Sequence, residues 1–272
     1  MSLPRLLAIV LLALCCGTAA PQCPATNTAF DAGEDLHYQL YFNWKFIWMK
    51  AGTANLNISQ ATHNGQPAYR CHLITRGNAR TDKFFMMRDT LVSYVSHDLL
   101  PLYYRKGALE GKRYYVDELW YSYPANGGVT LDQRFVSHRG EVSVKQEHTT
   151  ECPYDMCSML LRARSFDPKD YKEGQRITFP MADGHKVRQA TLIYRGRETF
   201  KMDNTGDTYR CLVFSFVDIE GRKEKEVVTF YVTDDLNHMP VRLDLYLRFG
   251  TAKAFLRQAT GLRNPQTALI KQ

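Results

Sequence analysis

Three side chains in the second half of the sequence carry groups that can bind a metal ion or transfer protons. Asp234, Asp235 and His238 place two carboxylates and an imidazole within five positions, and zinc accepts both kinds of ligand. Aspartate side chains in such segments also bind nearby backbone amides and stabilise turns. Because His97 and Asp98 stand at a comparable point in the first half, we favour the turn interpretation.

Sequence motifs of established enzyme classes are missing. The chain has no Gly-x-Ser-x-Gly, no phosphate-binding glycine loop, no His-Glu-x-x-His and no Cys-x-x-Cys. We therefore expect a protein without catalysis and without a cofactor. A hydrolase or metal enzyme that uses the Asp234 to His238 segment ranks last among the hypotheses.

Alternating aromatic residues mark the first strand-forming segment and a candidate ligand surface. Between Leu36 and Trp48 the apolar side chains share one parity, which is typical of a strand with one buried face. This aromatic face can line a cavity for an apolar or amphiphilic ligand, or it can pack in the core. The candidate ligand-binding residues are Tyr38, Phe42, Trp44, Phe46 and Trp48, with Met156 and Met159 from a later helix.

Five cysteines follow the N-terminal apolar segment: Cys23, Cys71, Cys152, Cys157 and Cys211. An oxidising compartment permits disulfides, and an odd number leaves at least one thiol free. Cys152 and Cys157 are the expected pair if the chain between them turns sharply, since on a continuous helix they would point to different faces. We expect Cys71 and Cys211 to be small buried side chains on equivalent strands.

The first twenty residues have the pattern of a secretory signal peptide. Arg5 precedes an apolar run from Leu6 to Leu14, and small residues suited to cleavage follow. We expect export to the periplasm or the periphery of the outer envelope. No transmembrane span is expected, because the apolar run is shorter than the roughly 20 residues that cross a bilayer. Cys15 and Cys16 leave lipoprotein anchoring open, although the residues before them suit lipidation poorly.

The charge of the chain is mildly positive. The formal net charge is +7, and removal of the signal segment takes away Arg5 alone and leaves +6. Positive and negative residues are interspersed, as in residues 222–226, which is typical of solvated loops. We expect no nucleic-acid partner, and a basic surface that faces anionic envelope lipids or polysaccharide stays open.

Strand patterns recur along nearly the whole chain and predict an all-β, mainly antiparallel fold. Residues 21–260 should form one domain with halves at about 30–150 and 170–260. The triplet Tyr69-Arg70-Cys71 returns as Tyr209-Arg210-Cys211, which indicates one β-unit used twice. Two curved halves with apolar faces can join into a barrel or half-barrel.

One helix interrupts the strand pattern. Residues 153–165 place apolar side chains at helical spacing, and we expect this helix to act as a plug or lid on the barrel, because an apolar sheet face must be covered. Residues 261–272 show no clear period and should form a loosely attached tail.

Several short motifs are spread over most of the chain. They are Gly33-Glu34 before the alternating aromatics, residues 51–54, Asp89 before a strand ending at Leu100-Pro101, residues 154–162, and residues 231–235 leading to 239–241. With these motifs the chain resembles a bacterial exported family known as domain of unknown function 3108. The resemblance implies export and a β-rich domain, and it carries over no catalytic residue. The opening of the predicted helix departs from the Asp-Pro form of the family.

These patterns lead to one leading hypothesis. It is a non-enzymatic envelope protein that holds an apolar or amphiphilic, lipid-like ligand in a β-barrel cavity. The alternative is a structural scaffold that binds another envelope protein or polysaccharide through strand edges or a basic surface.

Overall fold

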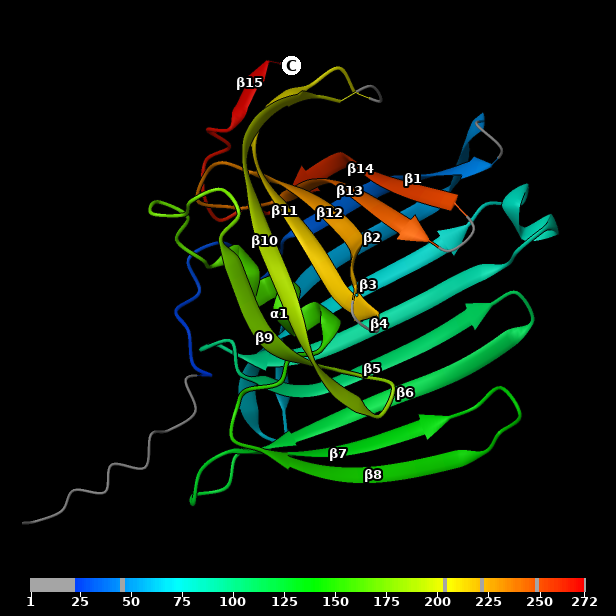
Figure 1. The fold of residues 1–272 in the computed structure, drawn as a ribbon, viewed down its shortest axis with the longest axis vertical. Helices are drawn as coiled ribbons and strands as arrows, with labels where there is room; N and C mark the ends of the chain where they lie inside the picture. The colour runs from blue at the N-terminus through cyan, green and yellow to red at the C-terminus, as the bar shows by residue number, and fades with distance from the viewer. Residues whose placement is uncertain (1–22, 45–46, 203–204, 221–222, 248–249, 272) are drawn as a thin grey trace, which may run out of the picture.

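The computed structural model describes residues 23–44, 47–202, 205–220, 223–247 and 250–271. The predicted signal peptide and Phe46 lie outside the described residues. The described part forms one antiparallel sheet of fifteen strands (Figure 1). Its strands are β1 (Asp35–Trp44), β2 (Ile47–His63), β3 (Gln66–Gly77), β4 (Met87–Ser96), β5 (Pro101–Glu110), β6 (Arg113–Ser122), β7 (Val129–Val136), β8 (Val142–Thr149), β9 (Arg176–Asp183), β10 (Lys186–Lys201), β11 (Thr208–Glu220), β12 (Lys223–Thr233), β13 (Pro240–Leu247), β14 (Gly250–Thr260) and β15 (Leu269–Lys271).

The order of the strands divides the sheet into two halves. Strands β1 to β8 pair with their neighbours in sequence, as do β9 to β14, and the antiparallel pair β1–β14 joins the two groups. Strands β8 and β9 are the two ends of this order and do not pair with each other. The sheet therefore curves, but its hydrogen bonds do not close it into a complete barrel. The prediction of an all-β, antiparallel half-barrel with one helix is confirmed.

The short helix α1 (Met156–Arg164) lies between the two halves of the sheet, against β3, β4 and β9 (Figure 1). Asp155 caps it: its Oδ1 accepts hydrogen bonds from the backbone amides of Cys157 and Ser158, both at 2.9 Å. This cap places the first helical turn after Asp155, so Pro153 precedes the helix. We call the end of the sheet that α1 covers the helix end and the opposite end the open end.

A buried ion pair ties the C-terminal turn of α1 to both halves of the sheet. The Arg164 guanidinium donates to the Glu34 carboxylate, with Nη2 at 2.8 Å from Oε2, and the two side chains are 1% and 0% exposed. Its Nε and Nη2 also donate to the Asn237 carbonyl, at 3.1 and 3.0 Å. Glu34 precedes β1, and Asn237 lies in the turn between β12 and β13. One side chain thus fixes three segments distant in sequence.

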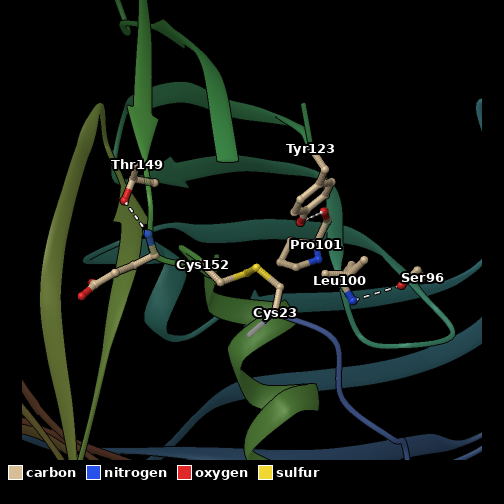
Figure 2. Close-up of a disulfide and its surroundings, with 8 residues drawn as sticks. Cys23, Ser96, Leu100, Pro101, Tyr123, Thr149 and Cys152 are labelled. Carbon is tan, nitrogen blue, oxygen red and sulfur yellow. Dashed lines mark hydrogen bonds between the residues drawn. A yellow bond between two sulfur atoms is a disulfide. The ribbon is translucent and has the colours of Figure 1, made fainter. Parts of the chain in front are cut away.

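A disulfide joins Cys23 to Cys152, across 129 positions of sequence. Figure 2 shows it at the N-terminal side of α1, between the segment before β1 and the connection from β8. The predicted pairing of Cys152 with Cys157 is wrong, because the capped helix takes Cys157 into the core, where its thiol meets that of Cys71. Cys71 and Cys211 are free and buried, as predicted.

Two strands, β9 and β15, were not predicted from the sequence patterns. Strand β9 contains Pro180, which interrupts a strand pattern but is tolerated at a sheet edge. Strand β15 pairs with β11, and the Ala268 amide donates to Asp235 Oδ2 at 3.1 Å. The C-terminal segment was expected to be loose, but it is attached to the sheet by the pairing of β15 with β11 and by the hydrogen bond to Asp235 in the β12–β13 turn.

Candidate functional site

The turn between β12 and β13 contains Asp234, Asp235 and His238. Asp235 Oδ1 accepts hydrogen bonds from the Thr233 hydroxyl at 2.8 Å and the Asn237 amide at 3.0 Å. His238 Nδ1 lies 2.6 Å from the Arg164 carbonyl, and Asp234 pairs with Arg197 at 3.1 Å. These contacts stabilise a turn, as the preferred interpretation expected. Among the described residues no group of three His, Cys, Asp or Glu side chains has metal-binding geometry.

The predicted ligand-binding residues do not form one surface. Tyr38 and Met159 are buried in the core, and the Tyr38 hydroxyl donates to the Pro240 carbonyl at 2.9 Å. Trp48 is 43% exposed and Met156 is 42% exposed, at opposite ends of the sheet. Phe42 is half-buried on β1. Trp44 belongs to β1, but its side chain, like Phe46, lies outside what the structure describes.

A register shift explains part of this scatter. The β1–β2 ladder shifts between Leu40 and Tyr41, so the alternation of faces is interrupted there. The chain then turns between β1 and β2, which puts Trp48 on the second strand of the hairpin. A single parity over residues 36–48 therefore does not correspond to a single face.

A pocket of about 600 Å³ opens at the end of the sheet opposite the helix. Three aromatic side chains, Phe85, Tyr115 and Phe135, line it with charged residues of the β5–β6 turn. The Tyr115 and Phe135 ring centroids are 6.1 Å apart, and the Tyr115 hydroxyl donates to Glu110 at 2.8 Å. We call this the open-end pocket; its lining is Phe85, Glu110, Gly111, Lys112, Arg113, Tyr115, Phe135, Ser137 and His138.

Polar side chains continue inward from this pocket along the concave face. Asp117 lies opposite Lys106 on β5 and Phe135 on β7, and Gln133 lies opposite the core residue Leu119. Residues paired in this way share one face of a sheet. We call Asp89, Lys106, Asp117, Gln133 and His185 the inner polar cluster. His185 comes from the β9–β10 turn, whose Gly184 amide donates to Asp117 Oδ2 at 2.9 Å.

Four atoms of the inner polar cluster have no protein hydrogen-bond partner. They are Asp89 Oδ1, Asp117 Oδ1, Gln133 Oε1 and His185 Nε2. Asp117 and Gln133 are each 2% exposed. A buried polar atom without a partner costs about 1–3 kcal/mol, so these four atoms are candidates for contacts with a bound ligand.

Burial shifts the ionisation of the two carboxyl groups. Desolvation, aided by the nearby Glu110 carboxylate, raises the pKa of Asp89 to about 6. Desolvation also raises the pKa of Asp117, although the hydrogen bond from the Gly184 amide opposes it. Both carboxylates are therefore less favourable in the charged form than in an unfolded chain.

Replacing Asp89 with asparagine should stabilise the protein at neutral pH and have little effect in acid. Because the folded-state pKa is raised, ionisation of Asp89 costs stability above about pH 6, and this cost disappears as the pH falls toward 4. Asp89 is partly exposed, so the gain should not exceed about 1 kcal/mol. Urea unfolding at about pH 8 and about pH 4 measures it. Asp170→Asn, at an exposed position, is the control; an equal gain at both pH values would contradict the assignment.

The inner polar cluster was not predicted, although the sequence contains a signal for it. Asp117 shares its parity with Leu119 and Tyr121, and Asp89 shares its parity with Leu91. These three apolar or aromatic side chains and two carboxylates thus occupy one face of the sheet, which is uncommon unless the carboxylate has a partner or a role. An inspection of strand parity for such carboxylates would have found it.

The fold and the pocket define a class: an open antiparallel β half-barrel with an internal helix and a pocket at one end. Among the described residues, no helix has both the length and the apolar character needed to cross a membrane. The chain belongs to the family described as "Protein of unknown function (DUF3108)", whose model matches residues 37–257. The family membership expected from the sequence motifs is confirmed.

A solved structure supports the architecture. The chain is similar to the crystal structure of a beta-barrel-like protein of domain of unknown function DUF1849 from Brucella abortus, with a TM-score of 0.51 and 8% sequence identity. The match covers 87% of this chain and 100% of that chain. At this identity the similarity shows the fold alone. A search of curated proteins gives no match.

Proposed function

We propose that the protein is a non-enzymatic, exported binding protein of the cell envelope that holds an amphiphilic, lipid-like ligand in the open-end pocket. The observation that carries the proposal is the combination of three aromatic rings with Lys112 and Arg113 around one opening. Export is supported by the N-terminal sequence pattern and by the Cys23–Cys152 disulfide, which suits an oxidising compartment.

The position of the pocket differs from the one proposed from sequence. The core between the two halves is filled by α1 and by buried aromatic and aliphatic side chains, Tyr38 and Met159 among them. The open-end pocket lies beyond this core, and its volume of about 600 Å³ is within the range of roughly 300–1,000 Å³ usual for small-molecule sites. An apolar chain can lie against Phe85, Tyr115 and Phe135, while an anionic group meets the cations at the mouth.

A second candidate function, saccharide binding, rests on a different observation. The inner polar cluster offers carboxylate and amide oxygens without partners, near Tyr115 and Phe135. Sugar hydroxyl groups are donors for such oxygens, and aromatic rings can pack against the faces of a sugar ring. This arrangement motivates the polysaccharide alternative at the inner side of the open-end pocket, behind the residues that form its lining.

Phe85→Ala should weaken binding of the amphiphilic probe anilinonaphthalene sulfonate by roughly five- to tenfold, because about half of a phenylalanine side chain no longer contacts it. Fluorescence titration of the purified full chain measures the effect. The matched control is Phe84→Ala, since Phe84 is 87% exposed and does not line the pocket.

Lipid extraction and native mass spectrometry of protein purified from its own host provide the direct test. A bound amphiphile that the probe displaces would support the proposal. Equal loss of probe affinity in the Phe84→Ala and Phe85→Ala variants would contradict it. Retention of a soluble oligosaccharide in place of lipid would select the second candidate.

A further inference from the structure

Exposed apolar side chains gather at the loop tips of the open end. Ile47 is 66% exposed beside the β1–β2 turn, and Phe84 is 87% exposed after the 3-10 turn η1 (Thr81–Lys83) between β3 and β4. Trp48, Phe85, Met86 and, on the β13–β14 hairpin, Leu247 are also exposed. Figure 1 shows the adjoining ends of β1 and β2 and the tips of the β3–β4, β5–β6 and β7–β8 connections along one edge, on the right of the view. Separate loops thus present apolar side chains in one direction.

The same loops carry an excess of positive charge. In residues 47–50, 78–86, 110–113 and 137–141 the exposed charged side chains are six cations and two carboxylates: Lys50, Arg80, Lys83, Lys112, Arg113 and Arg139 against Glu110 and Glu141. Asp82, also in this region, is partly buried and paired with Arg88. The apolar tips are therefore surrounded by cations.

The helix-end connections of the first half and the segment after α1 have the opposite charge. In residues 31–34, 97–100, 150–155 and 165–175 the exposed charged side chains are six carboxylates and two lysines: Asp31, Asp98, Glu151, Asp167, Asp170 and Glu173 against Lys169 and Lys172. A molecule with this distribution is oriented by a negatively charged surface, with the open end toward it.

We propose that the open end docks on an anionic lipid bilayer. The apolar tips, with Phe84 and Ile47 foremost, enter the interface between head groups and acyl chains, and the surrounding lysines and arginines contact the anionic head groups. Apolar insertion with electrostatic attraction is how peripheral proteins bind membranes, and each basic residue near the surface contributes roughly fivefold in affinity. Trp48, with the Lys253 ammonium 4.7 Å above its ring, has the amphipathic character favoured at the interface.

Docking also explains where the pocket opens. Phe85 and Lys112 belong both to the lining of the open-end pocket and to the loops of this surface. An amphiphile can then pass between bilayer and pocket without crossing open water; this step rests on the proposed function, whereas the docking surface itself does not.

Flotation of the full chain with phosphatidylcholine vesicles, with and without phosphatidylglycerol, tests the proposal. Binding is expected to the phosphatidylglycerol vesicles and to fall with added salt. Arg80→Gln/Lys83→Gln should weaken it on the order of twenty-fivefold, at about fivefold per charge. Ile47→Ser/Phe84→Ser should weaken it on the order of tenfold or more. None of these four residues lines the pocket, so probe binding should be unchanged in both variants.

Matched variants at the helix end are the controls. Leu236→Ser is the control for the apolar tips, because Leu236 is 64% exposed in the β12–β13 turn. Lys169→Gln/Lys172→Gln is the control for the cations, because it removes the same number of positive charges. Both should bind vesicles as the unmodified chain does. The proposal is overturned if the chain does not float with anionic vesicles, if neutral vesicles bind it equally, or if the control variants lose as much affinity as the open-end variants.

Discussion

Arg164→Met is expected to lower the free energy of unfolding by about 3–5 kcal/mol, because it leaves the Glu34 carboxylate buried without its counter-ion. Both side chains are almost completely buried, at 1% and 0% exposure. The Asn237 carbonyl loses its two donors from the guanidinium as well. The loss should therefore affect the helix, the start of β1 and the β12–β13 turn together. Urea unfolding followed by circular dichroism measures it.

A double-variant cycle shows whether the effect belongs to the pair. Glu34→Leu/Arg164→Met removes both charges and should recover a large part of the stability that either single change loses. Lys169→Met is the surface control, because its pair with Asp167, at 3.4 Å, is 83% and 66% exposed and such pairs contribute roughly 0–1 kcal/mol. If Arg164→Met lowered the free energy of unfolding no more than Lys169→Met does, the buried pair would stabilise the fold no more than an exposed pair.

Cys23→Ser/Cys152→Ser should also destabilise the protein strongly, by about 2–5 kcal/mol. The disulfide closes a loop of 129 positions, and in the chain-entropy account a long loop restricts the unfolded chain most. It also attaches the segment before β1 to the start of α1, close to the turn that ends at Pro101 (Figure 2). The thermal midpoint, recorded with and without a reductant, measures the loss.

The reductant separates the disulfide from other effects of the substitutions. It should lower the stability of the unmodified chain to about that of the double variant and leave the double variant unchanged. Cys211→Ala, which removes a free buried thiol, should respond to reductant as the unmodified chain does. If complete reduction of the unmodified chain left its thermal midpoint unchanged, the disulfide would not stabilise the fold.

The strands were predictable where one face is apolar and the turns have typical residues. Residues 113–123 and 129–137, separated by an Asn-Gly turn, correspond to β6 and β7, since alternation and turn chemistry are local properties. Strand β9 was missed because Pro180 is compatible only with an edge, and edge position is a property of the assembled sheet. The cysteine pairing failed for a similar reason, because Cys23 and Cys152 meet only in the folded chain.

The candidate site was harder to predict than the fold. Aromatic residues of β1 and β2 suggested a ligand surface, but a register shift and a hairpin distribute them over core and solvent. The open-end pocket combines Phe85, Tyr115 and Phe135 from three parts of the chain, and no spacing in sequence relates them. Strand parity could have identified Asp89 and Asp117 as carboxylates on an apolar face, but not the residues across from them.

The β1–β14 pair has a consequence for the order in which the chain can fold. Asp35 pairs with Thr260, and the ladder between them joins the first strand made to one of the last. Strands β1 to β8 and the Cys23–Cys152 disulfide need only the first half of the chain, so this half can assemble and be cross-linked early. Until β14 arrives, β1 remains an unpaired edge, open to pairing with another chain. The topology therefore leaves one edge of β1 exposed until the last strands of the second half have paired.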